Sequence, residues 1–131
     1  MAVRIMLADD NPAILEVVRQ MLEKDFDIAG AVQNPASLFE ELPKLKPDVL
    51  ILDISMEGMN GFEVTRRLVA DHCTAKIVFL TVHEEFDFIR AAFDAGASGY
   101  VFKSRMHTDL RPAIKAVHSG KAFLPQASLS Q

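Results

Sequence analysis

Residues 49–53, with the sequence Val-Leu-Ile-Leu-Asp, constrain the fold of this chain more than any other stretch. Four consecutive aliphatic residues predict a short strand that is buried on both faces, as the strands of parallel sheets are. Asp53 follows at the point where this strand would pass into a loop. A carboxylate so close to a buried strand is unfavourable unless a partner or a ligand compensates its charge, so Asp53 is the first candidate functional residue.

Three further apolar runs are also followed by polar side chains. The runs and the residues that follow them are 3–8 with Asp9 and Asp10, 77–80 with Thr81, and 99–102 with Lys103. In open sheets of parallel strands, the carboxyl ends of the strands meet at one edge, and ligands bind in the crevice there. We therefore expect the acids, the hydroxyl and the amine to gather at that edge.

The apolar runs alternate with helical patterns along the whole chain. A second strand is predicted at residues 28–32, and a single helix is predicted after each of the five strands. This alternation implies right-handed crossovers and a parallel five-stranded sheet with helices on both faces. At 131 residues the chain is long enough for one such α/β domain and too short for two.

Local signals predict how some of these helices end and which faces point inward. Pro43 is expected to shorten or bend the second helix, and Thr108 is expected to cap the last one. In the fourth helix, the helical spacing predicts that Phe86 and Ile89 face the core and that Phe88, between them, is half exposed.

The composition is that of an ordinary globular protein, with 50% hydrophobic and 24% charged residues. The longest apolar runs are too short for a membrane span, and the N-terminus lacks the pattern of a signal peptide. The single cysteine, Cys73, cannot form an internal disulfide, which agrees with a reducing compartment. The net charge of −4 disfavours binding of nucleic acid by this chain itself. We expect a cytoplasmic protein that does not bind membranes.

The acids at the predicted edge favour a metal ion. Asp9, Asp10 and Asp53 would repel one another in a partly desolvated cleft, and a hard divalent cation such as Mg²⁺ relieves this repulsion. Lys103 adds a positive charge and Thr81 a hydroxyl donor, and this combination stabilises a phosphoryl group during its transfer. Asp53 is then the predicted nucleophile, because carboxylates form acyl phosphates. The expected reaction is phosphoryl transfer to Asp53, followed by hydrolysis.

The pattern resembles the CheY-like receiver domain of response regulators in bacterial two-component signalling. The five matched residues are spaced by 43 positions from Asp10 to Asp53, 28 from there to Thr81, and 22 from there to Lys103, with Asp9 directly before Asp10. The resemblance, rather than the strand lengths, implies a flavodoxin-like (βα)5 three-layer sandwich with strand order 2-1-3-4-5. That order places the first and third strands, and hence their acids, side by side. Residues 1–124 would form the receiver, and residues 125–131 a tail or the start of a linker.

The resemblance also implies roles for individual residues. The implied Mg²⁺ ligands are Asp10, Asp53, the backbone carbonyl of Ser55, and Asp9 either directly or through water. Thr81 and Tyr100 correspond to a switch pair, in which the hydroxyl moves toward the phosphoryl group and the aromatic ring turns inward behind it. The implied phosphodonor is a sensor histidine kinase. Phosphorylation is expected to change the surface of the fourth helix, fifth strand and fifth helix, and so to promote homodimerisation.

Residues 94–100 and 113–125 resemble the NarL/FixJ branch of this family, in which a linker and a LuxR-type helix-turn-helix domain follow the receiver. The chain stops where that linker would begin. We therefore expect the receiver part of a transcription regulator, with DNA bound through a C-terminal domain that this chain lacks. A stand-alone receiver is the alternative.

Two departures from the family pattern keep other interpretations open. Glu57 stands where proline is usual, and Val82 stands where a small residue is usual. One alternative is a degenerate receiver that takes no phosphate and acts only as an interaction module. A phosphatase of the haloacid-dehalogenase type would need an acid where Ser55 stands, and an FMN-binding module would need a better phosphate cradle than a cluster of acids. Taken alone, Tyr100 suits a core position and His83 an exposed loop.

Overall fold

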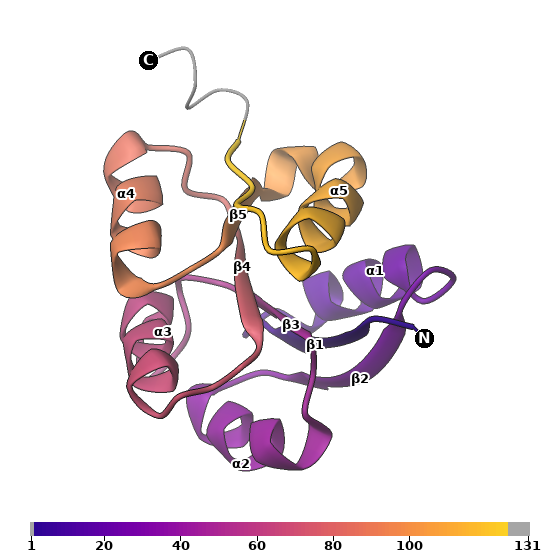
Figure 1. Ribbon diagram of the computed structural model, residues 1–131, viewed down its shortest axis with the longest axis horizontal. Helices are drawn as coiled ribbons and strands as arrows, with labels where there is room; N and C mark the ends of the chain where they lie inside the picture. Colours follow the sequence, from indigo (N-terminus) through magenta and orange to yellow (C-terminus); the bar gives the residue numbers. More distant parts are fainter. Residues whose placement is uncertain (1, 126–131) are drawn as a thin grey trace.

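The computed structural model describes residues 2–125 and contains alternating strands and helices (Figure 1). The strands are β1 (Arg4–Ala8), β2 (Asp27–Val32), β3 (Val49–Leu52), β4 (Lys76–Thr81) and β5 (Gly99–Phe102). The helices are α1 (Pro12–Leu22), α2 (Pro35–Leu45), α3 (Gly61–Ala70), α4 (Phe86–Ala95), the short 3₁₀ helix η1 (Lys103–Arg105) and α5 (Met106–His118). Within residues 2–125, no helix has the length and apolar composition needed to cross a bilayer.

The five strands are parallel and lie in the order β2-β1-β3-β4-β5, which confirms the predicted flavodoxin-like fold. Helices α1 and α5 cover one face of the sheet, and α2, α3 and α4 cover the other (Figure 1). The chain reverses its direction of progress across the sheet between β1 and β3. In open parallel sheets, ligands bind at the carboxyl edge next to such a reversal.

Alternate residues of the central strand β3 fill two separate hydrophobic layers. Leu50 and Leu52 pack in the layer shared with α2, α3 and α4, whereas Val49 and Ile51 pack in the layer shared with α1 and α5. All four side chains are at most 3% exposed, so the predicted burial of both faces is confirmed. Burying one such side chain stabilises the fold by about 1.5–3 kcal/mol. The strand that carries Asp53 at its end is therefore rigidly held.

Three helices begin at an asparagine that caps them. The side chains of Asn11, Asn34 and Asn60 accept hydrogen bonds from the backbone N–H groups of Ala13, Ser37 and Glu63, respectively. These bonds satisfy N–H groups that have no partner within the helix. Two of the caps, those of α1 and α3, directly follow the loops that leave β1 and β3, so they fix the chain after each of these two strands.

Two helix boundaries differ from the sequence predictions. Pro43 does not shorten α2, which continues to Leu45; because this proline lies in the last turn, its missing N–H removes only one hydrogen bond. Thr108 does not cap α5, because η1 runs directly into a helix that already begins at Met106. The Thr108 hydroxyl instead donates to the carbonyl of Arg105 at 3.1 Å.

The inward face of α4 also differs from the prediction. Phe86 is 52% exposed, whereas Ile89 is buried as expected and Phe88 is half-buried. Phe88 packs against the rings of Phe62 and His83, which the helical spacing alone does not indicate. Phe86 is the first residue of the helix, and the buried residues of α4 begin only one turn later, at Ile89. The start of α4 therefore presents an aromatic side chain to solvent.

Candidate functional site

Asp9 and Asp53 lie side by side because the strands that precede them pair in register. Ala8 of β1 pairs with Leu52 of β3, and the backbone N–H of Asp53 donates to the carbonyl of Ala8 at 3.1 Å. Both acids are almost buried, with 4% of Asp9 and 6% of Asp53 exposed, whereas Asp10 is exposed. Each of the three places a carboxylate oxygen within 4.8 Å of the others. The structure thus brings together the acids that were expected to meet.

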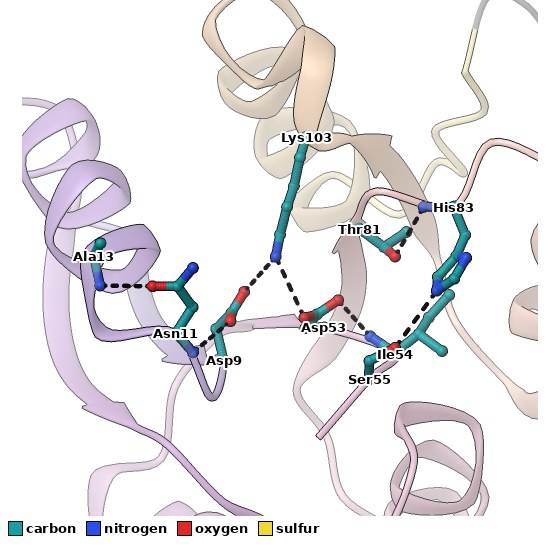
Figure 2. A network of polar contacts seen from close by, with 9 residues as sticks. All are labelled: Asp9, Asn11, Ala13, Asp53, Ile54, Ser55, Thr81, His83 and Lys103. Carbon is teal, nitrogen blue, oxygen red and sulfur yellow. Dashed lines mark hydrogen bonds and ion pairs between the residues drawn. The ribbon is translucent and has the colours of Figure 1, made fainter. Parts of the chain in front are cut away.

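Lys103 reaches into this acidic group from the start of η1, directly after β5 (Figure 2). Its Nζ lies 2.9 Å from Oδ2 of Asp9 and 3.3 Å from Oδ2 of Asp53. The Oδ1 atom of Asp9 accepts the backbone N–H of Asn11 at 2.9 Å, and that of Asp53 accepts the N–H of Ile54 at 2.8 Å. Each buried carboxylate is therefore oriented by a backbone group on one oxygen and by the ammonium group on the other.

The charges in this group do not balance. Burial raises the pKa of Asp53 and repulsion by Asp9 adds to the rise, while Lys103 and the N–H of Ile54 oppose it only in part. Burial alone would lower the pKa of Lys103, but the hydrogen bond to Asp9 and the charge of Asp53 outweigh it, and this pKa lies above its usual value. With Asp10 included, three carboxylates face one ammonium group, so the site has an excess of negative charge.

The acidic group offers the donors that a hard divalent cation needs. Mg²⁺ takes oxygen ligands, keeps several waters, and is often held by one or two protein carboxylates. Within residues 2–125, Asp9, Asp10 and Asp53 are the only three His, Cys, Asp or Glu residues with ligand atoms gathered in this way. Since a divalent cation would offset the excess negative charge, the residues present fit Mg²⁺.

The loop that follows β3 lies beside the acidic group. Ser55 is exposed there, and its Oγ is 3.4 Å from Nε2 of His83 in the loop that follows β4 (Figure 2). Glu57 is exposed in the same loop, and Val82 is 66% exposed. The two departures from the family pattern therefore lie in contact with solvent, outside the buried part of the site.

Thr81 and Tyr100 are both fully buried, and both are bonded to the backbone of His83. The Oγ1 atom of Thr81 accepts the N–H of His83 at 3.2 Å, and the Tyr100 hydroxyl donates to the His83 carbonyl at 2.8 Å. Burial raises the pKa of Tyr100, so its hydroxyl keeps its proton and acts as a donor. The threonine and tyrosine singled out in the sequence are thus joined through one residue of the β4–α4 loop.

His83 is less exposed than the loop histidine that the sequence predicted. Only 29% of its side chain is exposed, and its ring stacks on Phe88 with the centroids 4.3 Å apart and the planes 8° from parallel. Its Nδ1 lies 3.7 Å from a carboxylate oxygen of Glu85. These contacts depend on how the loop folds back onto α4, and no spacing in the sequence indicates that path.

Comparison with protein families and curated proteins identifies relatives of the chain. The family model described as the response regulator receiver domain matches residues 5–115. The nitrate/nitrite response regulator protein NarP of Escherichia coli (strain K12) is 35% identical over 119 residues, which cover 89% of this chain and 55% of NarP. The transcriptional regulatory protein LnrK of Bacillus subtilis (strain 168) is 29% identical over 131 residues, which cover 98% of this chain and 60% of LnrK. The chain therefore spans little more than half the length of these relatives.

Solved structures with the same fold include two regulators. The isolated REC domain of RcsB from Salmonella enterica serovar Typhimurium, in the presence of the phosphomimetic BeF3−, superposes with a TM-score of 0.91 at 29% identity, covering 99% of this chain and 98% of that one. A two-component response regulator of the LuxR family from Aurantimonas sp. SI85-9A1 has a TM-score of 0.93 at 30% identity, covering 99% of this chain and 94% of that one. Both matches extend over nearly the whole chain.

Proposed function

The chain belongs to the response regulator receiver domain family, and from that premise we propose that it is a phosphoacceptor in two-component signalling. Proteins of this family are signalling proteins rather than classical enzymes. In the proposed reaction, a partner sensor histidine kinase donates a phosphoryl group to Asp53, and the acyl phosphate is later hydrolysed. The observation that carries this proposal is the Lys103 ammonium group held between Asp9 and Asp53 at the carboxyl edge of the sheet.

The proposed transfer forms one bond and breaks another. A carboxylate oxygen of Asp53 attacks phosphorus, a P–O bond forms, and the P–N bond to the histidine of the kinase breaks. The groups that would hold Mg²⁺ are the carboxylates of Asp9, Asp10 and Asp53 and the backbone carbonyl of Ser55. When bound, the ion neutralises charge on the phosphoryl oxygens. Lys103 provides a further positive charge, and the hydroxyl of Thr81 donates to a phosphoryl oxygen.

The proposed switch passes from Thr81 to Tyr100. A phosphoryl oxygen would draw the Thr81 hydroxyl toward Asp53, and the hydrogen bonds of His83 would convey this change to Tyr100. The ring of Tyr100 is already buried in this structure. Phosphorylation would therefore hold the ring in its inward position rather than bring it there.

The test is the intact mass of the protein after incubation with acetyl phosphate and Mg²⁺. The wild type should gain one phosphoryl group, and the gain should disappear when Mg²⁺ is chelated. Asp53→Asn should gain nothing, because it lacks the nucleophile. Asp71→Asn, which changes an exposed acid at the far end of α3, is the matched control and should gain the group like the wild type. A wild type that gains no mass would instead favour a degenerate interaction module.

We further propose that the chain is the receiver part of a transcription regulator. The relative LnrK supports this by name, since it is a transcriptional regulatory protein. In this proposal residues 1–124 are the receiver unit, in a cytoplasmic protein that binds no membrane. DNA would be bound by a further domain and not by this chain, whose net charge is −4. Residues 125–131 would begin a linker, of which 126–131 lie outside the described residues.

A phosphorylation-dependent homodimer through α4, β5 and α5 is part of the same proposal. Two RcsB dimers bound to two parallel DNAs have been solved, which supports dimerisation in this branch. Sedimentation velocity with beryllofluoride and Mg²⁺ should show dimers of the wild type. Phe86→Ser removes an exposed aromatic ring of α4 and should lower the dimer fraction, whereas Val17→Ser, at a 40% exposed position of α1, should not. Loss of dimers in Val17→Ser alone would place the interface on α1 instead.

A further inference from the structure

The chain that follows α5 returns to the sheet and lies along β5 (Figure 1). We call residues 121–125 the edge segment. Phe123 forms a parallel bridge with Gly99: the N–H of Tyr100 donates to the carbonyl of Phe123 at 3.1 Å, and the N–H of Phe123 donates to the carbonyl of Ser98 at 3.0 Å. The edge segment thus pairs with the outer backbone groups of β5, which would otherwise be an open strand edge.

Side chains hold the edge segment in this position. Phe123 is half-buried and packs against the hydrophobic layer shared by α1 and α5, and Pro125 is buried. Leu124, between them, is 43% exposed. This alternation of inward and outward side chains is that of a short strand with one face on the core. Phe123 therefore anchors the edge segment to the core.

Tyr100 donates one hydrogen bond from its side chain, toward the acidic site, and one from its backbone, toward the edge segment. Its hydroxyl donates to the carbonyl of His83, whose N–H donates to Thr81, and its own backbone N–H donates to Phe123. Three hydrogen bonds, joined through the covalent structure of His83 and Tyr100, therefore connect Thr81 at the site with Phe123 beyond the last helix. The path uses the tyrosine side chain for one contact and its backbone for the other.

We propose that Phe123 is a positioning residue for the phosphoryl site, and that the docked edge segment and an occupied site stabilise each other through Tyr100. The inference rests on the proposed function of Asp53. The element with two states is the edge segment, which is either docked with two backbone hydrogen bonds or released. By linkage, an anion at Asp53 strengthens docking by the same factor by which docking strengthens anion binding. Occupancy of the site would then change how firmly the chain at residue 125 is held against the sheet.

Amide hydrogen exchange of the wild type, with and without beryllofluoride and Mg²⁺, tests the first half of this coupling. The N–H groups of Tyr100 and Phe123 make the two docking bonds, so their exchange reports docking directly. We expect the ligand to slow both by about fivefold or more. The N–H of Asp27, bonded to Val3 at the opposite edge of the sheet, is the matched control and should change less than twofold. Equal slowing at all three positions would reflect global stabilisation and would overturn the inference, as would no slowing.

Variants of the edge segment test the other half. Phe123→Ala should weaken beryllofluoride binding by about fivefold or more, and Phe123→Leu, which keeps apolar packing, should restore part of the loss. Leu124→Ala removes an exposed side chain of the same segment and should bind within twofold of the wild type. If Phe123→Ala fails to fold, Phe123→Leu and the exchange data decide. If the wild type binds beryllofluoride and Phe123→Ala binds it equally well, this inference alone is overturned. If the wild type binds no beryllofluoride, the proposed function is overturned as well.

Discussion

At Asp53, two effects work against the charge that the proposed chemistry needs. The carboxylate is buried and lies beside Asp9, and both conditions raise its pKa. Lys103 and the N–H of Ile54 favour the ionised form, but they do not cancel the rise. The ionised side chain is thus held in a fixed orientation although its charge lowers the stability of the folded protein. Such a cost is expected of a functional residue rather than of a structural ion pair.

Asp53→Asn should therefore stabilise the metal-free protein at neutral pH. A pKa that is raised in the folded state means that the acid favours folding at low pH, and that this contribution is lost as the pH rises through the folded-state pKa. Asparagine has no such dependence, so the variant should be more stable than the wild type at pH 7. The gain should vanish as the pH falls toward 3.8, the ordinary value for the group. Thermal unfolding in EDTA across this range measures it.

The control for this prediction is Asp87→Asn, which changes an exposed acid in the first turn of α4. A negative charge is favourable at the start of a helix, so this variant should lose a little stability instead of gaining it. A gain for Asp53→Asn that is independent of pH would show that the carboxylate charge is not its cause.

The sequence predicted the acids of the site better than the residues around them. Asp53 could be recognised because an acid directly after four aliphatic residues is a local pattern. His83 could not, because its stacking on Phe88 and its bonds to Thr81 and Tyr100 arise from the path of a loop. The spacing of residues in a sequence predicts helices and strands, and it says little about contacts between side chains that a loop brings together.

Among the elements, α3 bears on the site because its first residue packs directly against the end of β3. The N–H of Gly61 donates to the carbonyl of Ile54 at 2.7 Å. A Cβ atom on Gly61 would lie 2.5 Å from the carbonyl oxygen of Asp53 and 2.6 Å from the ring of Phe79. Such distances are too short for ordinary contacts, so only glycine lets the helix approach the strand this closely.

Gly61→Ala should therefore disturb both stability and phosphorylation. Relief of the clash requires either α3 or the backbone of Asp53 to move, at a cost of about 2 kcal/mol in the free energy of unfolding. A shift of Asp53, the proposed nucleophile, by a fraction of an ångström should slow labelling by acetyl phosphate by about tenfold or more. Asn60→Ala is the control: it removes the cap of the same helix, costs about 1 kcal/mol, and should leave the labelling rate within threefold. Equal rates for the two variants would show that the close approach of α3 does not position Asp53.

For the whole molecule, the sequence predicted the alternation of strands and helices and the doubly buried central strand, because both leave periodic patterns. The strand order followed from the resemblance to receiver domains, since no local pattern distinguishes one order of parallel strands from another. The edge segment was missed entirely. Its pairing with β5 rests on the backbone around one residue, Phe123, and a single bridge is too short to leave a periodic signal.

The excess of acid at the site also bears on the stability of the whole protein. The folded chain holds three carboxylates together, and the unfolded chain holds them apart, so a divalent cation that binds at the site stabilises the folded state alone. Mg²⁺ at about ten times its dissociation constant should add about 1.4 kcal/mol to the free energy of unfolding. For a domain of this size, that corresponds to a rise in Tm of roughly 4 °C.

Asp10→Asn separates this effect from a general effect of salt. Because Asp10 is exposed, its replacement should change the metal-free stability by no more than about 0.5 kcal/mol. The variant should nevertheless lose most of the rise in Tm with Mg²⁺, since one of the three carboxylates that gather at the site is gone. Thermal unfolding with MgCl₂, and with KCl at the same ionic strength, measures both quantities. If KCl raised the Tm of the wild type as much as MgCl₂ does, screening of the acids rather than a bound ion would account for the stabilisation.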